Sequence, residues 1–260
     1  MKKFILFNLF LFIFSGLATA QTADEIIDNY LQNIGGKDKL SKIKALHIKA
    51  KTNAQGMEIP VDIYMTSDGK QYIQFELQGK KMVQLAFDGK TAWHTNFMNM
   101  QNEKYDNETT ENLKRNSKGE FPNPFLNYKD KGYKVELIGK DEIEGTETFK
   151  IKLTEHPVLS EGKEVNKESY YYFDAENFVP LVAEEEVKSG QMKGAKIQQV
   201  FSDFQEVDGL YFPFSTMTKF NGMPGQEIKI VSVEINPEID QDMFTFKETA
   251  TGTTAPTEQK

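Results

Sequence analysis

Apolar side chains recur at every second position in several stretches of this chain. The first sets are Ile59, Val61, Ile63 and Met65, then Ile73, Phe75 and Leu77, then Val83, Leu85 and Phe87. Successive side chains of a β-strand point to opposite faces of a sheet, so a period of two places each set on one face. The pattern predicts half-buried strands and argues against a helical bundle as the body of the fold.

Turn sequences that contain glycine separate these strands at intervals of roughly ten residues, which is typical of a β-meander. They are Ser67-Asp68-Gly69-Lys70, Leu77-Gln78-Gly79-Lys80 and Phe87-Asp88-Gly89-Lys90. Further alternating segments follow at 133–138, 148–154, 169–174, 179–187, 196–206, 210–220 and 227–235. Together they predict a mainly β fold (α+β) of about 11 antiparallel strands, and the apolar faces favour a sheet that curls around its own interior.

Two helical segments are expected beside the strands. Residues 22–34 have apolar positions at helical spacing, with Thr22 as the N-cap and Glu25 at the capping-box position, and Gly35-Gly36 ends the segment. A second helix is expected to begin near Asp106, within an insertion that spans residues 101–131. The aromatic stretch from Phe121 to Phe125 fits either a plug of the core or a lid that faces a ligand, because both bury the same side chains.

The two ends of the chain are expected to lie outside the folded domain. Residues 1–20 combine a basic start, an apolar run over residues 4–14 and small residues before position 21, which predicts a signal peptide cleaved between Ala20 and Gln21. That run is too short to span a bilayer, which takes about 20 residues. Residues 249–260 lack large apolar side chains and predict a disordered tail. A single domain is therefore expected over residues 21–248.

The composition argues against several classes of function. The 260-residue chain has a net charge of −8, no cysteine and a single arginine, Arg115. The composition therefore argues against nucleic acid as a partner, since only one guanidinium group is present to hold phosphates. No cysteine is available for a disulfide, a thiolate metal site or a lipid anchor. The three histidines lie far apart, and no nucleophile elbow or phosphate-binding loop occurs, so we expect neither an enzyme nor a bound metal or cofactor.

Four segments of the chain match sequence motifs of one known protein family, in the same order and at similar spacing. Residues 84–96 contain D-G-K-x-x-W, and Tyr171-Tyr172-Phe173-Asp174 is followed by Val179-Pro180-Leu181. Residues 201–213 contain Phe201-Ser202-Asp203-Phe204 and a D-G hairpin that ends at Pro213, and Ile235-Asn236-Pro237 precedes Ile239-Asp240 and Met243-Phe244. Over most of residues 22–247 the chain thereby resembles the periplasmic lipoprotein carriers of the LolA type.

The resemblance implies an unclosed antiparallel half-barrel, with an N-terminal helix and a mid-chain helical lid over an apolar cavity. In that family the cavity takes the acyl chains of lipoproteins and carries them across the periplasm without nucleotide hydrolysis. The family also has an arginine that latches the lid, on the strand before the D-G-K turn. The matching position here is Gln74, and Arg115 is the only arginine of the chain.

We therefore expect a periplasmic carrier of lipoproteins or other lipids that acts in outer-membrane lipoprotein sorting, with inner- or outer-membrane envelope proteins as partners and a monomeric state. The expected cavity residues are Ile63, Met65, Ile73, Phe75, Leu85, Phe87 and Trp93, and the expected lid contacts are Phe97, Met98, Phe121 and Phe125. An error of one residue in register would exchange each strand residue for its neighbour. The alternative is an envelope lipid sensor or protein-interaction module on the same fold.

Overall fold

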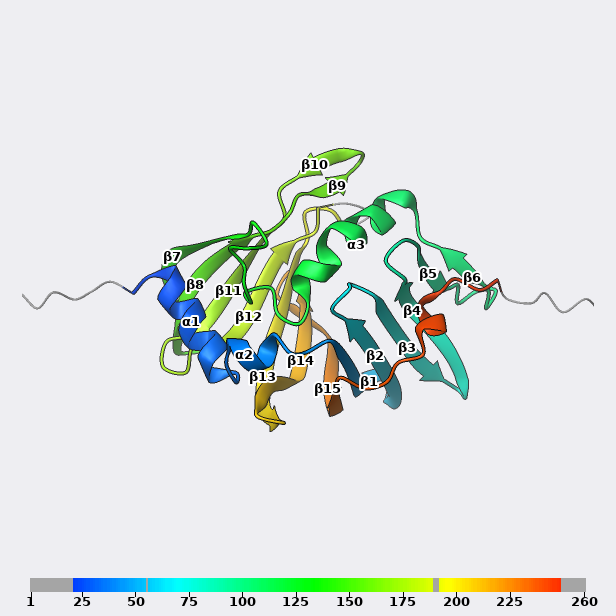
Figure 1. Cartoon of the computed structure of the whole chain (residues 1–260), viewed down its shortest axis with the longest axis horizontal. Helices are drawn as coiled ribbons and strands as arrows, with labels where there is room; N and C mark the ends of the chain where they lie inside the picture. Colours follow the sequence, from blue (N-terminus) through cyan, green and yellow to red (C-terminus); the bar gives the residue numbers. More distant parts are fainter. Residues whose placement is uncertain (1–20, 55, 189–191, 249–260) are drawn as a thin grey trace, which may run out of the picture.

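The computed structural model describes residues 21–54, 56–188 and 192–248, and the expected signal peptide and C-terminal tail lie outside these residues. A single antiparallel sheet of 13 strands dominates the described residues (Figure 1), in the order β6-β5-β4-β3-β2-β1-β15-β14-β13-β12-β11-β8-β7. The first six strands are β1 (Ala45–Ala54), β2 (Met57–Thr66), β3 (Gln71–Leu77), β4 (Lys80–Phe87), β5 (Ala92–Thr95) and β6 (Asn102–Lys104). The others are β7 (Lys134–Ile143), β8 (Thr146–Thr154), β11 (Glu168–Asp174), β12 (Pro180–Glu186), β13 (Lys196–Val207), β14 (Leu210–Phe220) and β15 (Met223–Ile235).

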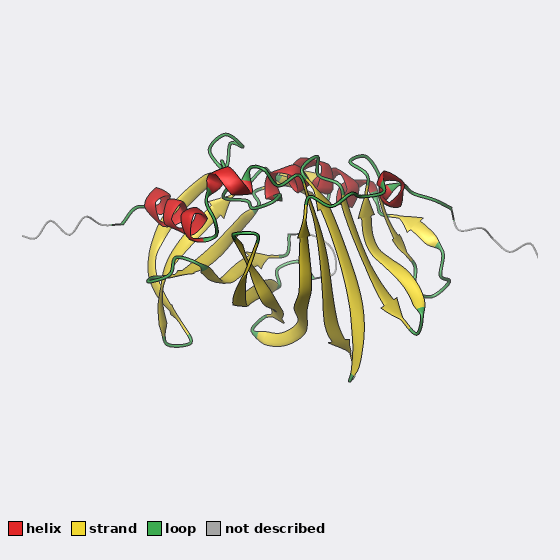
Figure 2. Ribbon diagram, turned by 60° about the horizontal axis from the view of Figure 1, so that its bottom comes forward, coloured by secondary structure: helices red, strands yellow, loops and turns green. Residues whose placement is uncertain are grey.

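The pairing of β1 with β15 places the first and last strands at the middle of the sheet. The sheet is not closed, because β6 and β7 form its two edges, and it curls into a half-barrel (Figure 2). The expected architecture is thus confirmed, with two strands more than the estimate. A separate hairpin is formed by β9 (Val158–Ser160) and β10 (Lys163–Val165). Strands of three residues, such as β6, β9 and β10, are too short to show an alternating pattern in the sequence.

Three α-helices and a short 3₁₀ helix accompany the sheet: α1 (Ala23–Asn33), α2 (Lys37–Leu40), α3 (Asn107–Glu120) and η1 (Gln241–Phe244). The α1 helix begins at the expected capping box, in which the Thr22 hydroxyl accepts from the Glu25 amide and the Glu25 carboxylate accepts from the Thr22 amide. Asp106 is the N-cap of α3, and its carboxylate accepts from the Thr109 amide at 2.7 Å. Both helices lie along the same side of the molecule in Figure 2.

The main core lies between this helical layer and one face of the sheet, which we call the inner face. Apolar residues of α1 and of the segment after α3 pack there against residues of β1, β8, β11 and β15. The ring of Tyr30 in α1 meets Phe125 at 6.0 Å and Phe173 of β11 at 5.2 Å, both edge-on. The aromatic stretch 121–125 is therefore a structural bridge between α1 and the sheet.

Strand register assigns the side chains of the N-terminal half to the two faces. Ile48, Ile63, Ile73 and Leu85 are paired in sequence across β1, β2, β3 and β4, so they share the inner face. A β-bulge at Ile73/Gln74 then shifts the register between β3 and β4, so that Val83 pairs with Gln74. The bulge breaks the two-residue alternation that would have placed Val83 on the same face as Leu85. Val83 therefore lies on the opposite, outer face, which differs from the face expected from its spacing.

The outer face of this half is covered by the C-terminal segment. Trp93 pairs with Ala86 and packs with Val83 and Phe246, and its indole nitrogen donates to the Phe244 carbonyl at 2.9 Å. The Phe244 side chain is fully buried. None of the helices in the described ranges is long and apolar enough to cross a membrane.

Candidate functional site

A row of apolar side chains crosses the inner face of the N-terminal half. Ile63 on β2, Ile73 on β3 and Leu85 on β4 are direct partners in neighbouring strands, and Met65 continues the row on β2. Adjacent strands lie about 4.8 Å apart, so these side chains form a continuous apolar surface. Each is only half-buried, whereas Phe87, also on this face, is fully buried. Four of the expected cavity residues thus lie together and keep accessible surface.

Phe75 extends this surface along β3 toward the β3–β4 turn. It lies on the inner face opposite Met82, and its ring meets the ring of Phe97 at 5.5 Å. A shallow hollow of about 360 Å³ lies at the tip of the β3–β4 hairpin, and its lining includes Phe75, Met82, Phe97 and Met100. Phe97 and Met98, which were expected as lid contacts, lie in the β5–β6 turn, where they are 57% and 96% exposed. The β6 strand separates this turn from α3 in the sequence.

Three other expected site residues, Phe121, Phe125 and Trp93, do not face the expected cavity as accessible side chains. Phe121 and Phe125 are buried in the main core, and Phe125 contacts Tyr171 at 4.8 Å. Their packing favours the core plug over a lid side chain free to face a ligand. Trp93 lies on the outer face, because its partner Ala86 has the opposite orientation to Leu85 and Phe87.

A second hollow, of about 220 Å³, lies where α1 and the stretch 122–125 face β13 and β14. Its lining is mostly apolar and aromatic, and includes Tyr30, Ile34, Tyr171, Phe201 and Phe212. No sequence pattern linked these residues, since they come from segments up to about 180 residues apart.

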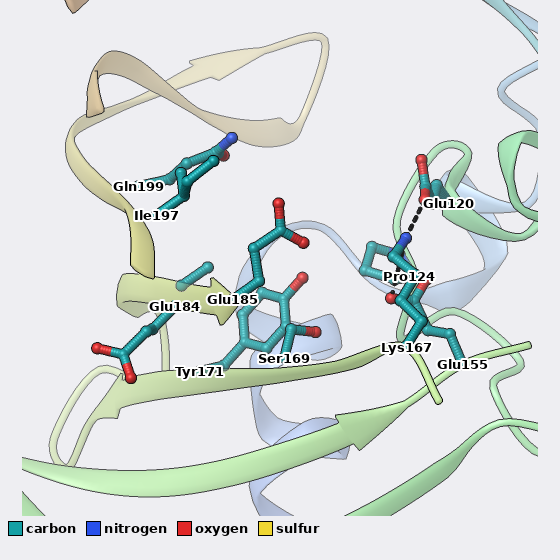
Figure 3. Close-up of a pocket in the computed structure, with 11 residues that line it drawn as sticks. Glu120, Pro124, Glu155, Lys167, Ser169, Tyr171, Glu184, Glu185, Ile197 and Gln199 are labelled. Carbon is teal, nitrogen blue, oxygen red and sulfur yellow. Dashed lines mark hydrogen bonds and ion pairs between the residues drawn. The ribbon is translucent and has the colours of Figure 1, made fainter. Parts of the chain in front are cut away.

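A third hollow, of about 310 Å³, lies over β11, β12 and β13 and is half polar (Figure 3). The Lys167 ammonium group makes ion pairs with two carboxylates in its wall, that of Glu120 at the end of α3 and that of Glu155 at 3.2 Å. Ser169 and Tyr171 of β11 and Glu185 of β12 line the other side. The cluster of Glu120, Glu155 and Lys167 was not predicted, because these three residues are separated by 12 or more positions and match no local motif.

Burial shifts the acid–base properties of this cluster. Desolvation raises the pKa of the Glu155 carboxyl, and nearby Lys167 only partly offsets it. For Lys167 burial acts to lower the pKa, but the attraction of Glu120 and Glu155 outweighs it, so the net pKa is raised. The lysine therefore stays charged and holds the end of α3 to the segment just before β11.

The N-terminal part of α3 is attached to the β9–β10 hairpin by polar contacts. The Asn112 amide donates to the Leu159 carbonyl at 2.9 Å, and its oxygen accepts from the Leu159 amide at 2.6 Å. Arg115 reaches Glu164 of the same hairpin at 2.8 Å. The buried residues of α3 itself are Asn116 and Ser117. The helix over the inner face is therefore held mainly by hydrogen bonds and ion pairs.

Gln74 does not take part in holding this helix. It lies on the outer face, where its amide donates to Asp62 at 3.2 Å and its oxygen accepts from the Tyr72 hydroxyl at 3.2 Å. Asp62 also meets His47 Nε2 at 2.9 Å. In the described residues, no group of three or more His, Cys, Asp or Glu side chains is arranged to hold a metal ion.

Comparison with solved structures shows that the chain has a LolA-like fold. A LolA superfamily protein from Nitrosomonas europaea matches with a TM-score of 0.51 and 12% identity, over 87% of this chain and 99% of that chain. A DUF1329 family protein from Desulfovibrio piger matches with a TM-score of 0.51 and 12% identity, over 87% of this chain and 98% of that chain. No family model and no curated protein matches the sequence.

Proposed function

We propose that this chain binds the acyl chains of a lipid or a lipoprotein on its inner face and carries them through the periplasm. The observation that supports the proposal is the row formed by Ile63, Ile73 and Leu85, which stays half-exposed on the inner face of a LolA-like sheet. An apolar surface of this kind has a cost in water unless a ligand covers it. Each buried CH₂ of an acyl chain contributes about 0.8 kcal/mol to binding.

Binding requires the helical layer to move. The two apolar hollows have volumes of about 220 and 360 Å³, near or below the lower end of the range of about 300–1,000 Å³ for small-molecule sites. A full acyl chain therefore needs more space than either provides. The polar attachment of α3 suits such a movement, because hydrogen bonds and ion pairs exchange with water at little net cost when a helix lifts.

The cellular role in this proposal is the sorting of outer-membrane lipoproteins. The expected signal peptide would deliver the chain to the periplasm, and the absence of cysteine means that the chain cannot itself be a lipoprotein. Cargo transfer would then involve envelope proteins at the inner or outer membrane. Neither a nucleotide nor a metal is required for a cycle driven by the relative affinities of donor, carrier and acceptor.

A direct test compares a diacylated lipopeptide with the same peptide lacking its acyl chains. We expect the purified mature chain to bind only the acylated form, in titration calorimetry below the critical micelle concentration, and Phe75→Glu to weaken that binding. Equal binding of both peptides, or of neither, would contradict the proposal. Failure to deliver bound lipopeptide to acceptor vesicles, despite normal binding, would favour the lipid sensor over the carrier.

A further inference from the structure

The half-polar hollow over β11–β13 has more negative than positive charge. Its lining includes four glutamates and one lysine, Lys167. Lys167 is occupied by Glu120 and Glu155, and the Glu184 carboxylate is occupied by Lys196 at 3.1 Å and by Gln198 at 2.9 Å. The remaining carboxylate, that of Glu185, makes no hydrogen bond or ion pair with the described part of the chain. Figure 3 shows Glu185 directed into the hollow and Glu184 directed away from it.

Two buried oxygen atoms in the same lining also lack partners. Glu155 Oε1 and Ser169 Oγ make no hydrogen bond with the residues that the structure describes, although Glu155 is 8% exposed and Ser169 is 6% exposed. A buried polar atom without a partner costs about 1–3 kcal/mol, so native proteins leave few of them. Both atoms belong to residues that line the hollow, where a ligand with hydrogen-bond donors would satisfy them.

The half-polar hollow also adjoins the apolar one. Pro124 and Tyr171 line both, so the two spaces adjoin at this pair of side chains. A ligand with a polar group in one space and an apolar chain in the other would fit this arrangement. The hollow offers carboxylates, a hydroxyl without a partner in the described part of the chain and an aromatic ring. These groups together favour a positively charged ligand group that donates hydrogen bonds.

We propose that this hollow binds the primary ammonium head group of an amphiphile, with its apolar chain directed past Tyr171 into the space beside α1. The inference rests on the proposed function, because it assigns a head-group site to a lipid bound between the inner face and the helical layer; the space beside α1 belongs to the half of the sheet away from the row of Ile63, Ile73 and Leu85. A primary ammonium group has three N–H donors. In this assignment they are shared among Glu185, Glu155 Oε1 and Ser169 Oγ.

The test uses three lysophospholipids with the same acyl chain, carrying an ethanolamine, a choline or a glycerol head group. We expect the ethanolamine lipid to bind about tenfold more tightly than the other two, since a charge-assisted hydrogen bond supports a difference of this size. Choline carries the same charge but has no N–H donor, and glycerol has no positive charge. Affinities would be measured by titration calorimetry below the critical micelle concentrations.

Adjacent residues of β12 provide the variant and its control. Glu185→Gln should remove the preference for the ethanolamine lipid, whereas Glu184→Gln should keep it, because Glu184 points away from the hollow and is already paired. Glu185 is exposed, so its replacement should leave the fold intact. Equal affinities for the three lipids in the wild type, or a preference unchanged by Glu185→Gln, would overturn the head-group assignment alone.

Two further outcomes separate this inference from the proposed function. Absence of binding by all three lysolipids would contradict the proposed function itself. Spermidine tests whether the shared ammonium chemistry comes from a free polyamine instead of a lipid. In one outcome, Glu185→Gln weakens the binding of spermidine and leaves the binding of the ethanolamine lipid unchanged. That result would overturn the assignment of the hollow to a lipid head group.

Discussion

Placing a carboxylate in the apolar row of the inner face should weaken the binding of an acyl chain in a pH-dependent way. Ile73 is the centre of this row, with Ile63 and Leu85 as its partners on the neighbouring strands. In Ile73→Glu a bound chain would cover the new carboxylate and remove it from water. The side chain can avoid that penalty by taking up a proton, and the free energy of protonation sets an upper limit to the effect.

The upper limit follows from the pKa of a solvated glutamate, about 4.3. At pH 7 protonation costs about 3.7 kcal/mol, which corresponds to a loss of about 500-fold in affinity. At pH 5 the cost falls to about 1 kcal/mol, or about fivefold. We therefore expect Ile73→Glu to weaken binding by between about tenfold and about 500-fold at pH 7, and this charge-dependent loss to shrink markedly at pH 5.

The assay is a titration with a fluorescent fatty acid analogue whose own head group does not titrate in this pH range. Ile73→Gln is the uncharged control, and its loss of affinity should not depend on pH. Val231→Glu, at a 60% exposed position on β15, controls for added charge on the sheet and should bind normally. Wild-type affinity in Ile73→Glu, or the same loss in Val231→Glu, would refute the assignment of the inner face as the binding surface.

Three further predictions concern the supports of the site. Phe244→Ala should lower the free energy of unfolding by about 3–5 kcal/mol and shift Trp93 emission to the red, because the buried ring and the segment over Trp93 are lost together; unchanged denaturation and emission would contradict this. Arg115→Met should speed amide hydrogen exchange in α3 but not in the central strands, since the ion pair with Glu164 is broken. Burial lowers the pKa of Lys131 to about 8 from 10.5. The free energy of unfolding of the wild type, measured relative to that of Lys131→Met by chemical denaturation, should therefore increase as the pH rises from 8 to 10.5. A difference between the two proteins that stays constant over this range would contradict the prediction.

The sign of the Lys131 prediction follows from proton binding. Between the two pKa values the unfolded chain binds a proton that the folded chain has released, so stability rises with pH in this window. The Lys131 ammonium donates to the carbonyls of Gly119 at 2.6 Å and Asn123 at 3.1 Å. These bonds favour the charged form and the side chain is partly exposed, so the gain should be about 1 kcal/mol or less.

Features set by neighbouring residues were predictable from the sequence. The capping box of Thr22 and Glu25, the Asp106 cap of α3 and the glycine turns each depend on a few adjacent residues, and the structure has them where they were expected. The alternation of apolar residues likewise identified most strands. Local chemistry alone determines these elements, so a single sequence contains enough information to find them.

The face of the sheet on which a side chain lies was less predictable, because it depends on the pairing between strands. The bulge at Ile73/Gln74 moves Val83 to the outer face, and the change of phase between β4 and β5 places Trp93 there as well. A shift of one residue exchanges the two faces, and nothing in either strand alone reports it. The cluster of Lys167, Glu120 and Glu155 was not predictable for a similar reason, since only the curl of the sheet brings these residues together.

Native mass spectrometry of the chain recovered from its own host tests the central claim most directly. We expect a mature protein that carries one lipid or acylated polypeptide. The complex should be lost in Ile73→Glu and retained in Val231→Glu. A wild-type chain that is recovered without ligand, and that takes up no acylated peptide when one is supplied, would contradict the account.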